Sequence, residues 1–411
     1  MPNKKICMIT YMKRPEHCPP LYNTAISLVK KGYEVVGIFL FSEYSTTKKE
    51  TIIPGFSIIF ISLTIRDCCN RFFKNLNSNK IFLTIRYLLV YIEYSIKTIY
   101  HAIKINADLY EAHDIQAILP TAVVAKLFTK KFLYRAHELF AEKSEPVWLS
   151  YIHKIKEKTF IKYADLVVTP EKNRALIYEN EYKISTKPLI IQNTPIYRPK
   201  ISSQILYEKF KELNINVSKI VIYQGLLADD RCIDEIITAA ESFHDSVKLV
   251  IIGQGFGRWY NYYKKSNNFK NLLILPYVNY NQLPHYTASA DIGILMYRNT
   301  CRNNYFCAPN KLFEYMMMGL PVITCNYPGL IEIVEKNEIG LCVNPESPEE
   351  IASAVNKLAT DNELYNKMSN NCLMLSKSKY NWEIEFQKFY PKYKELLQDS
   401  TLEKSINEIN K

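Results

Sequence analysis

The chain has 411 residues, of which 52 are Lys or Arg and 41 are Asp or Glu, so its formal net charge is +11. This length suits two to three domains, a hydrophobic content of 48% is enough for sizeable cores, and no internal repeat or low-complexity tract appears. The ten cysteines are scattered without metal-ligand spacing, which predicts a reduced compartment and no metal site.

The N-terminal half alternates short apolar strands with helices. Residues 6–10, 35–41 and 55–62 are predicted strands, and residues 19–32 form a predicted helix that ends at glycine. Further strands follow at 108–114, 131–138 and 165–170. Strands spaced by helices predict an α/β fold with a doubly wound parallel sheet. The N-terminus has no apolar stretch long enough for a signal peptide, so we expect the chain to be cytoplasmic.

The segment 66–104 carries the residues best suited to bind an acidic partner. Its cations outnumber its two acidic residues and are interleaved with aromatic residues; the cations are Arg66, Arg71, Lys74, Lys80, Arg86, Lys97 and Lys104. Such a segment can lie peripherally on an anionic membrane, here the inner face of the plasma membrane, although a packed helix with a basic solvent face is an equal alternative. The apolar run 81–96 is too short and too charged to span a bilayer. No nucleic-acid motif or dense basic stripe is present, so we expect no nucleic-acid partner.

A second alternating series runs from residue 220 to 343, after a linker at 192–203 that Asn193, Pro195 and Pro199 keep from being helical. Two parallel sheets place ligands at the carboxyl ends of their strands, so site residues are sought there. We therefore divide the chain into domains 1–195 and 200–375.

Residues 309–322 predict a helix that binds a ligand at its N-terminus. Pro309 suits the first helical position, and Gly319 ends the helix. Lys311 and Glu314 share a face away from the apolar stripe, near free N–H groups and a positive dipole end that attract phosphate. A carboxylate one turn further in could accept two ribose hydroxyls. On spacing alone, a solvated Lys–Glu pair beside a core helix explains the pattern equally well.

This segment resembles the donor-binding helix of the family-4 retaining glycosyltransferases, which have the GT-B fold and use nucleotide sugars. Other segments match the family in the same order, namely 220–240, 249–257, 272–297, 327–334 and 340–343. The resemblance is strong over residues 218–360 and weak before them. It implies two Rossmann-like domains facing across a cleft, the first on the acceptor side and the second binding the donor. It also implies that a C-terminal helix at 380–405 returns to the first domain.

The resemblance assigns roles to residues of the donor domain. Arg231 and Lys311 would hold the diphosphate, Glu314 the ribose, and the base would stack near Tyr277. The expected donor-binding set is Gly225, Arg231, Gly253, Tyr277, Val278, Asn310, Lys311 and Glu314.

In the first domain, two histidines end predicted strands. His137 resembles the family's active-site histidine, which contacts the donor sugar, and Glu138 is the acidic residue after it. We expect these two to be catalytic. His113 and Asp114 are further candidates at the neighbouring strand end, although a histidine there is more often structural.

Three positions depart from the family's pattern. Cys232 and Pro309 stand where glycine is usual, and Phe306 stands where a second glutamate is usual. These departures bear on the donor-sugar contacts, and they keep open the alternative of a catalytically silent partner subunit.

The sequence therefore predicts a retaining, metal-independent glycosyltransferase without a cofactor. It would move a sugar from a nucleotide sugar, with UDP favoured, to a cell-envelope glycan or a lipid-linked acceptor of capsule or lipopolysaccharide type. A nucleotide-sugar epimerase of the same fold is another alternative. It would need acid–base carboxylates in the first domain, where only Glu138 and Asp114 are found.

Overall fold

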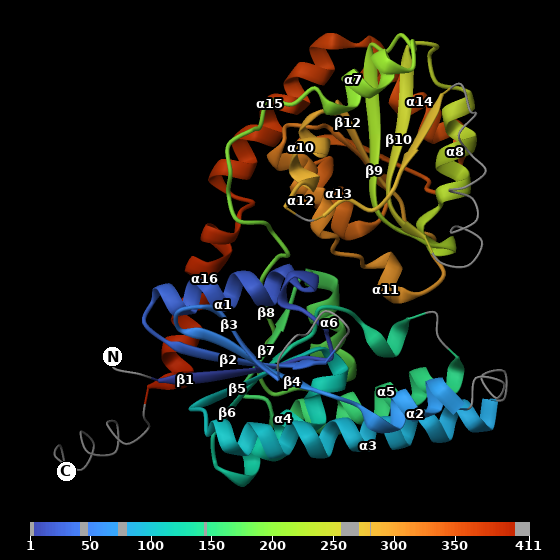
Figure 1. The fold of residues 1–411 in the computed structure, drawn as a ribbon. Coiled ribbons are helices and arrows are strands. Elements are labelled where there is room, and N and C mark those ends of the chain that lie inside the picture. The colour runs from blue at the N-terminus through green and yellow to red at the C-terminus, as the bar shows by residue number, and fades with distance from the viewer. Residues whose placement is uncertain are drawn as a thin grey trace. The chain divides into compact units, whose positions relative to one another are not determined.

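The computed structural model describes residues 4–41, 48–72, 80–143, 146–255, 271–279 and 281–398. The chain forms two compact units. The N-unit comprises residues 1–141, 145–191 and 386–411, and the C-unit comprises residues 142–144 and 192–385. Each unit is an α/β layer structure built on one sheet (Figure 1).

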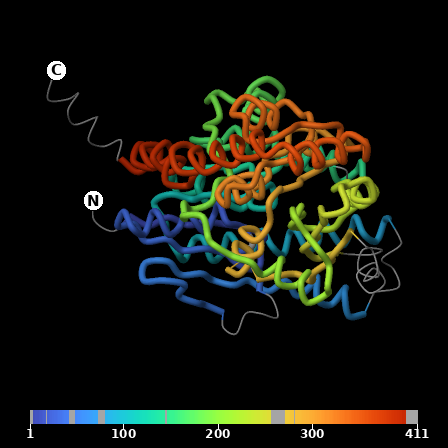
Figure 2. Tube along the Cα trace, turned by 90° about the horizontal axis from the view of Figure 1, so that it is seen from above, coloured from blue at the N-terminus to red at the C-terminus, as the bar shows by residue number. Residues whose placement is uncertain are grey.

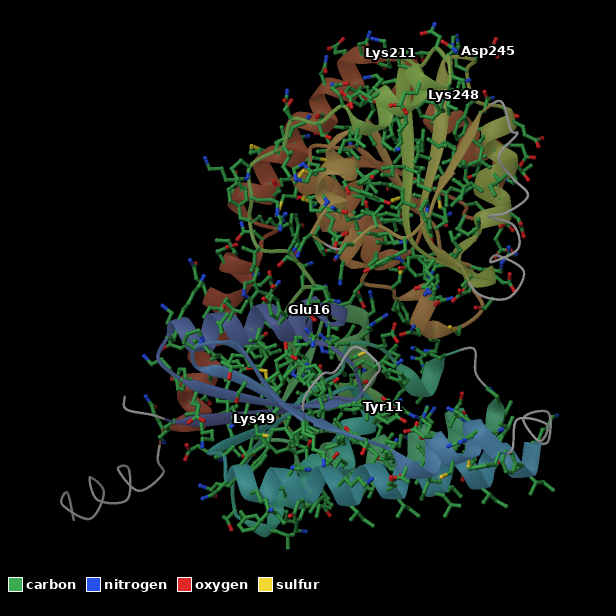
Figure 3. The ribbon with its side chains drawn as sticks, in the orientation of Figure 1. Tyr11, Glu16, Lys49, Lys211, Asp245 and Lys248 are labelled. Atoms are coloured by element: carbon green, nitrogen blue, oxygen red, sulfur yellow. The ribbon has the colours of Figure 1, made fainter. Side chains whose placement is uncertain are left out.

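The N-unit sheet has the order β3-β4-β2-β1-β5-β6-β7-β8 and is parallel except for β3. Its strands are β1 (Lys5–Ile9), β2 (Glu34–Leu40), β3 (Lys49–Ile53), β4 (Phe56–Ile61), β5 (Leu109–His113), β6 (Lys131–Arg135), β7 (Leu166–Thr169) and β8 (Leu189–Ile190). The central strands are apolar runs because helices cover both of their faces. The sequence pattern missed β3, an antiparallel edge strand whose Lys49, Glu50 and Thr51 give it no apolar face (Figure 3).

Helices α3, α4 and α5 lie along one face of this sheet and α1 lies on the other (Figure 1). The helical segments are η1 (Pro15–His17), α1 (Pro19–Lys30), α2 (Thr64–Phe72), α3 (Lys80–Ile105), α4 (Asp114–Leu127), η3 (Phe140–Glu142), α5 (Val147–Phe160), η4 (Ile161–Tyr163) and α6 (Lys172–Glu181). Pro120 inside α4 donates no N–H to the carbonyl of Gln116, and the hydroxyl of Tyr91 on α3 donates to that carbonyl instead, at 3.2 Å. This bond ties α3 to α4.

The last described helix, α16 (Trp382–Leu397), belongs to the N-unit from residue 386 on. Tyr393 donates a hydrogen bond to Glu111 on β5 at 2.5 Å, and Arg135 lies over the ring of Phe389 at 5.3 Å from its centroid. Lys4 donates to the carbonyl of Leu397, so the end of α16 lies beside the start of β1 (Figure 2). The helix expected over 380–405 thus begins at Trp382, and residues 399–405 lie outside the described residues.

The C-unit sheet is fully parallel, with the order β11-β10-β9-β12-β13-β14. Its strands are β9 (Lys219–Leu227), β10 (Val247–Gly255), β11 (Leu272–Leu275), β12 (Ile292–Leu295), β13 (Val322–Cys325) and β14 (Gly340–Val343). Its helices are α7 (Ile205–Glu212), η5 (Asp229–Arg231), α8 (Ile233–Glu241), α10 (Leu283–Ala288), α11 (Arg302–Tyr305), α12 (Asn310–Met317), α13 (Pro328–Val334), α14 (Pro348–Thr360) and α15 (Asn362–Ser378). Helix α8 packs against α14, and α12 packs against α15.

The predicted helix after residue 309 is present, with one correction at its start. Pro309 is the residue that precedes the helix, with an extended backbone (φ −77°, ψ 133°), and α12 begins at Asn310. The prediction that Pro309 occupies the first helical position is therefore wrong by one residue, because proline's fixed φ suits the extended as well as the helical conformation. The end is as predicted, since Gly319 takes φ +72° just after α12.

Across the part of the chain that the structure describes, no helix combines the length and the apolarity that a bilayer crossing requires.

Candidate functional site

The carboxyl edge of the C-unit sheet gathers the residues predicted to hold a donor. Strand β9 leads through Gly225 and Leu227 to η5, which ends at Arg231. Helix α12, with Lys311 in its first turn, enters the same edge between β12 and β13. In a parallel α/β sheet this is the edge where ligands bind.

Lys311 lies against two aromatic rings. Its Nζ is 4.2 Å from the ring centroid of Tyr223 and 5.9 Å from that of Tyr297. Gly225 has φ +132°, and a Cβ there would come within 3.2 Å of this Nζ. Glycine therefore allows this backbone conformation and leaves space for the ammonium group. Burial and the neighbouring Arg231 lower the pKa of Lys311 to about 7. This lysine is therefore only partly charged at neutral pH.

Arg231 is fixed beside Lys311 by an aromatic ring and a carboxylate. Its guanidinium lies 4.4 Å from the ring centroid of Tyr297, and its Nη1 donates to Asp230 Oδ2 at 2.6 Å. Asn304 Nδ2 also donates to that oxygen, at 3.2 Å. Both cations thus share the ring of Tyr297, which keeps two positive groups at one strand edge.

Cys232, the first of the three departures, adopts a left-handed backbone (φ 51°, ψ 38°) between η5 and α8. This conformation costs a non-glycine residue about 1 kcal/mol or more, which explains why glycine suits the position. The Cys232 side chain is fully buried in the core. The turn that presents Arg231 therefore forms although Cys232 stands where glycine is usual.

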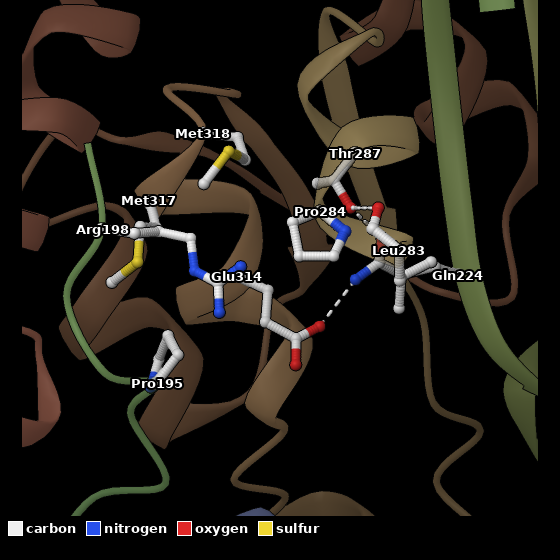
Figure 4. Close-up of a pocket in the computed structure, with 9 residues that line it drawn as sticks. All are labelled: Pro195, Arg198, Gln224, Leu283, Pro284, Thr287, Glu314, Met317 and Met318. Atoms are coloured by element: carbon white, nitrogen blue, oxygen red, sulfur yellow. Dashed lines mark hydrogen bonds between the residues drawn. The ribbon is translucent and has the colours of Figure 1, made fainter. Parts of the chain in front are cut away.

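Glu314 lines a pocket in the C-unit. Gln224 Nε2 donates to Glu314 Oε2 at 2.6 Å, and Thr287 Oγ1 donates to Gln224 Oε1 at 2.7 Å (Figure 4). Among the described residues, no donor is hydrogen-bonded to the second oxygen, Oε1. Burial raises the pKa of Glu314, against the opposing effects of Gln224, Lys311 and Arg198.

Figure 4 shows Arg198 and Met317 on one side of Glu314, and Gln224 with Thr287 on the other. The pocket is lined by Pro195, Arg198, Gln224, Leu283, Pro284, Thr287, Glu314, Met317 and Met318. Its walls are mostly apolar, with a few converging polar groups, as is usual for small-molecule sites. Sequence reasoning missed Gln224; the available signal was a polar residue that follows an apolar run directly before a glycine.

The remaining donor-binding candidates lie in different surroundings. Gly253 faces Gly225 across β9 and β10, where a Cβ would lie 1.7 Å from the carbonyl oxygen of Gly225, so its absence lets the two strands pair closely. Asn310 opens α12 and is half-buried. Tyr277 is 62% exposed and Val278 packs against the core, and neither lines the Glu314 pocket.

In the N-unit, the carboxyl edge of the sheet brings both histidines together. His113 Nδ1 and His137 Nε2 are 2.9 Å apart, and the two rings are stacked with 5.2 Å between centroids. The backbone of His137 is held twice, because its N–H donates to Asp114 Oδ1 at 3.1 Å and its carbonyl accepts from Arg174 Nη1 at 2.6 Å. Asp114 reaches this position with a left-handed backbone (φ 65°). Glu138 follows, half-buried.

Glu111, which sequence reasoning missed, lies behind the two histidines. Its Oε1 is 3.1 Å from His113 Nε2, and its Oε2 accepts the hydrogen bond of Tyr393. Burial lowers the pKa of His113 although Glu111 opposes the change. Burial, with Arg135 and His113, holds the pKa of His137 well below its ordinary value. Both imidazoles are therefore neutral at pH 7, and each keeps one ring nitrogen able to accept a proton.

Comparison with known proteins fits this geometry. Residues 207–372 match the family described as "Glycosyl transferases group 1". The chitobiosyldiphosphodolichol beta-mannosyltransferase of Candida albicans is 22% identical over 259 residues, which are 58% of this chain and 55% of the relative. The chain thus spans about half the length of the curated relatives it matches.

Two solved structures share the fold over nearly the whole chain. Anabaena HepE, in complex with UDP and glucose, superposes with a TM-score of 0.71 at 14% identity and covers 95% of this chain and 100% of its own. WaaG, a glycosyltransferase involved in lipopolysaccharide biosynthesis, gives a TM-score of 0.63 at 15% identity, with 93% and 98% covered. The two parallel-sheet units are therefore those of the GT-B fold, which confirms the predicted fold class.

Proposed function

We propose that this chain, whose residues 207–372 belong to the glycosyl transferases group 1, moves a sugar from a nucleotide sugar to an acceptor. A UDP-sugar is the favoured donor, and a cell-envelope glycan or lipid-linked sugar is the acceptor. One observation carries the proposal: Arg231 and Lys311 both lie near the ring of Tyr297 at the sheet's carboxyl edge, and Glu314 lines the pocket one helical turn further on.

In this proposal the two cations act on the leaving group. Breakage of the glycosidic bond places negative charge on the diphosphate, and preorganised positive groups stabilise that charge. Arg231 is held ready by Asp230 and Tyr297, whereas Lys311 gains a proton when the phosphate arrives. The free amides at the start of α12 add their dipoles. Glu314 Oε1 would accept the ribose hydroxyls.

The transfer step is proposed to need neither metal nor cofactor, and to retain the anomeric configuration. Neutral His137, with its backbone clamped by Asp114 and Arg174, would contact the donor sugar. Oxygens of the departing diphosphate would assist the acceptor hydroxyl. Glu138, the acidic residue that follows His137, is proposed as a second catalytic residue of this step.

A donor-hydrolysis assay tests the proposed function. The full chain is incubated with a panel of nucleotide sugars, and both nucleoside diphosphate and sugar isomers are quantified. Slow release of UDP, accelerated by an added envelope-type acceptor, is expected of the transferase. Interconversion of the sugars without release would make the chain an epimerase instead. Tight binding without either reaction would make it a silent partner subunit.

The pKa of Lys311 predicts how UDP affinity depends on pH. The empty-site pKa is about 7, and a bound phosphate raises it, so the lysine must take up a proton on binding once the pH exceeds 7. We expect the affinity for UDP to fall about tenfold per pH unit above pH 7. On the acid side, the affinity should increase as the pH is raised from 5.5 to about 6, because the terminal phosphate of UDP ionises there. Calorimetric titration with UDP from pH 5.5 to 9 measures both limbs. Lys311→Arg should flatten the alkaline limb, and a flat profile in the parent chain would contradict the assignment.

We further propose that α3 attaches the protein to the anionic inner face of the plasma membrane. Its exposed large apolar residues are Ile81, Ile85, Leu88, Leu89, Ile92, Ile96, Tyr100 and Ile103. At 3.6 residues per turn they fall within a sector of about 120° that runs along the whole helix. A solvent-exposed stripe of this kind marks an interaction surface.

Three of the four cations of α3 follow one edge of this apolar stripe. Arg86 donates to Asn70 at 2.6 Å, Lys97 pairs with Glu93 at 2.6 Å, and Lys104 bonds to Tyr100. Cations flanking an apolar face complement an anionic lipid surface. The sequence suggested a mainly electrostatic contact, whereas this geometry favours apolar insertion assisted by charge. Phe73 and Lys74, part of the same hypothesis, lie outside the described residues.

Two charges placed in the stripe should release the protein from vesicles. Ile92→Glu combined with Ile96→Glu removes two side chains that would each contribute about 1.5–3 kcal/mol on insertion, so vesicle partitioning should fall at least about 100-fold. Sedimentation with anionic and neutral vesicles measures this. Leu213→Glu, at a residue of the C-unit with 54% exposure, is the matched control and should sediment like the parent. If the double variant sediments with anionic vesicles as the parent does, α3 is an ordinary packed helix with a solvent-exposed face.

A further inference from the structure

Three potential metal ligands meet at the carboxyl edge of the N-unit sheet. Cys18 comes from the segment after β1, where Tyr11 and Glu16 are labelled in Figure 3, while His113 ends β5 and His137 follows β6. Cys18 Sγ, His113 Nδ1 and His137 Nε2 all lie within 4.8 Å of one another. The sulfur is 3.8 Å from His137 Nε2, which is 2.9 Å from His113 Nδ1.

We propose that Cys18, His113 and His137 bind a Zn²⁺ ion with a fourth position open to solvent. Zinc accepts thiolate and imidazole ligands at about 2.3 and 2.0–2.1 Å in a tetrahedral arrangement. These bond lengths place two nitrogen ligands about 3.3 Å apart, and a nitrogen and a sulfur about 3.6 Å apart. The observed 2.9 and 3.8 Å separations differ from these values by only a few tenths of an ångström. The third separation, between Cys18 Sγ and His113 Nδ1, lies within 4.8 Å and must approach about 3.6 Å by side-chain rotation.

The surroundings of His113 supply the second observation. His113 Nε2 and Glu111 Oε1 are buried, 3.1 Å apart, yet they make no well-aligned hydrogen bond. A metal at Nδ1 would fix the ring's proton on Nε2, where it faces this carboxylate. Metal-bound histidines commonly donate their other N–H to a carboxylate in this way. Tyr393 holds the far oxygen of Glu111 and so orients the group.

The partial exposure of His137 gives the fourth position its access. Cys18 is 6% and His113 1% exposed, whereas His137 is half-buried, so an ion would enter from its side. Binding exchanges the thiol proton for the metal: Cys18 becomes a thiolate, one proton is released, and both imidazoles stay neutral. The affinity should therefore rise with pH.

The metal would compete with the transfer reaction. This consequence rests on the proposed function, because zinc would take the ring nitrogen that His137 would otherwise turn towards the donor sugar. Micromolar zinc should then lower transfer, and a chelator should restore it. The site itself does not depend on that role.

Cobalt and zinc titrations of the full chain, produced without a histidine tag and stripped with a chelator, test the site. One equivalent of Co²⁺ should give the visible spectrum of a tetrahedral ion with sulfur-to-metal charge transfer, and Zn²⁺ should displace it. Cys18→Ser and His113→Gln should each weaken zinc binding at least about 100-fold, and Glu111→Gln about 10- to 100-fold.

The controls are chosen from the same unit. Cys68→Ser, at an exposed cysteine on α2, and His101→Gln, on α3, should bind zinc like the parent. A cobalt spectrum without sulfur charge transfer overturns the proposal even if a ligand variant fails to fold. Unchanged zinc affinity in both folded ligand variants does the same. If zinc binds without any effect on transfer, the metal site is supported and its inhibitory role is overturned.

Discussion

Lys311→Met is expected to bind UDP about 10- to 150-fold more weakly than the parent chain while binding uridine equally well. The lysine makes a charge-assisted bond only to phosphate in our proposal, and such a bond contributes about 1.5–3 kcal/mol. Methionine has a side chain of similar length and leaves out the charge, and with it the cation–π contact to Tyr223. Calorimetric titrations with UDP and with uridine measure the two affinities.

The same variant should make the empty protein more stable, which separates a binding role from a structural one. A lysine whose pKa is lowered to about 7 by folding destabilises the folded state at neutral pH, because the unfolded chain binds the proton more tightly. Replacing it by an apolar residue removes that cost and its repulsion of Arg231. Thermal unfolding at pH 6.5 should therefore shift upward by a few degrees. A lower melting temperature with equal losses for UDP and uridine would show that Lys311 supports the fold instead.

Sequence patterns could predict much of this site because the signals were local. The α12 helix was bounded by Pro309 and Gly319, and Lys311 and Glu314 were separated from its apolar stripe by spacing alone. His113 and His137 were found because each ends a short apolar strand, and the edge of a parallel sheet brings such ends together.

What the sequence could not supply were partners far apart along the chain. Gln224, Thr287 and Glu314 form one hydrogen-bonded chain across three elements, and nothing local in the sequence links them. Cys18 and His137 are 119 positions apart, so the spacing rules that identify most zinc sites did not apply. Only the folded units bring these groups into contact.

The exposed stripe on α3 shows a different limit. Its hydrophobic periodicity predicts a helix, but the same pattern is expected for a helix that packs on a core. The structure instead leaves Ile81, Ile92 and Ile96 more than half exposed, while Val90 and Tyr94 face inward. Periodicity gives the helix, and only burial shows which of its two apolar faces is covered.

Glu314→Gln is expected to leave the fold intact and to remove most of the transfer activity through weaker binding at the ribose. In the parent, Gln224 Nε2 donates to Glu314 Oε2, and Oε1 remains for the ligand. In the variant, the amide oxygen must accept from Gln224, so its NH₂ group points at the ribose hydroxyls. A donor then replaces an acceptor, and UDP affinity should fall by about 1.5–3 kcal/mol.

The paired variant Gln224→Glu with Glu314→Gln tests this geometry. A carboxylate at position 224 accepts from Thr287 and can only accept from position 314, so the amide at 314 donates its NH₂ group to that carboxylate and turns its oxygen towards the ribose. We therefore expect the paired variant to recover part of the UDP affinity that the single variant loses. No recovery in the paired variant would mean that the orientation of the amide does not explain the loss. Parent-like affinity and turnover in Glu314→Gln alone would show that the ribose assignment is wrong, because a carboxylate that accepts two hydroxyl groups cannot be replaced there without loss.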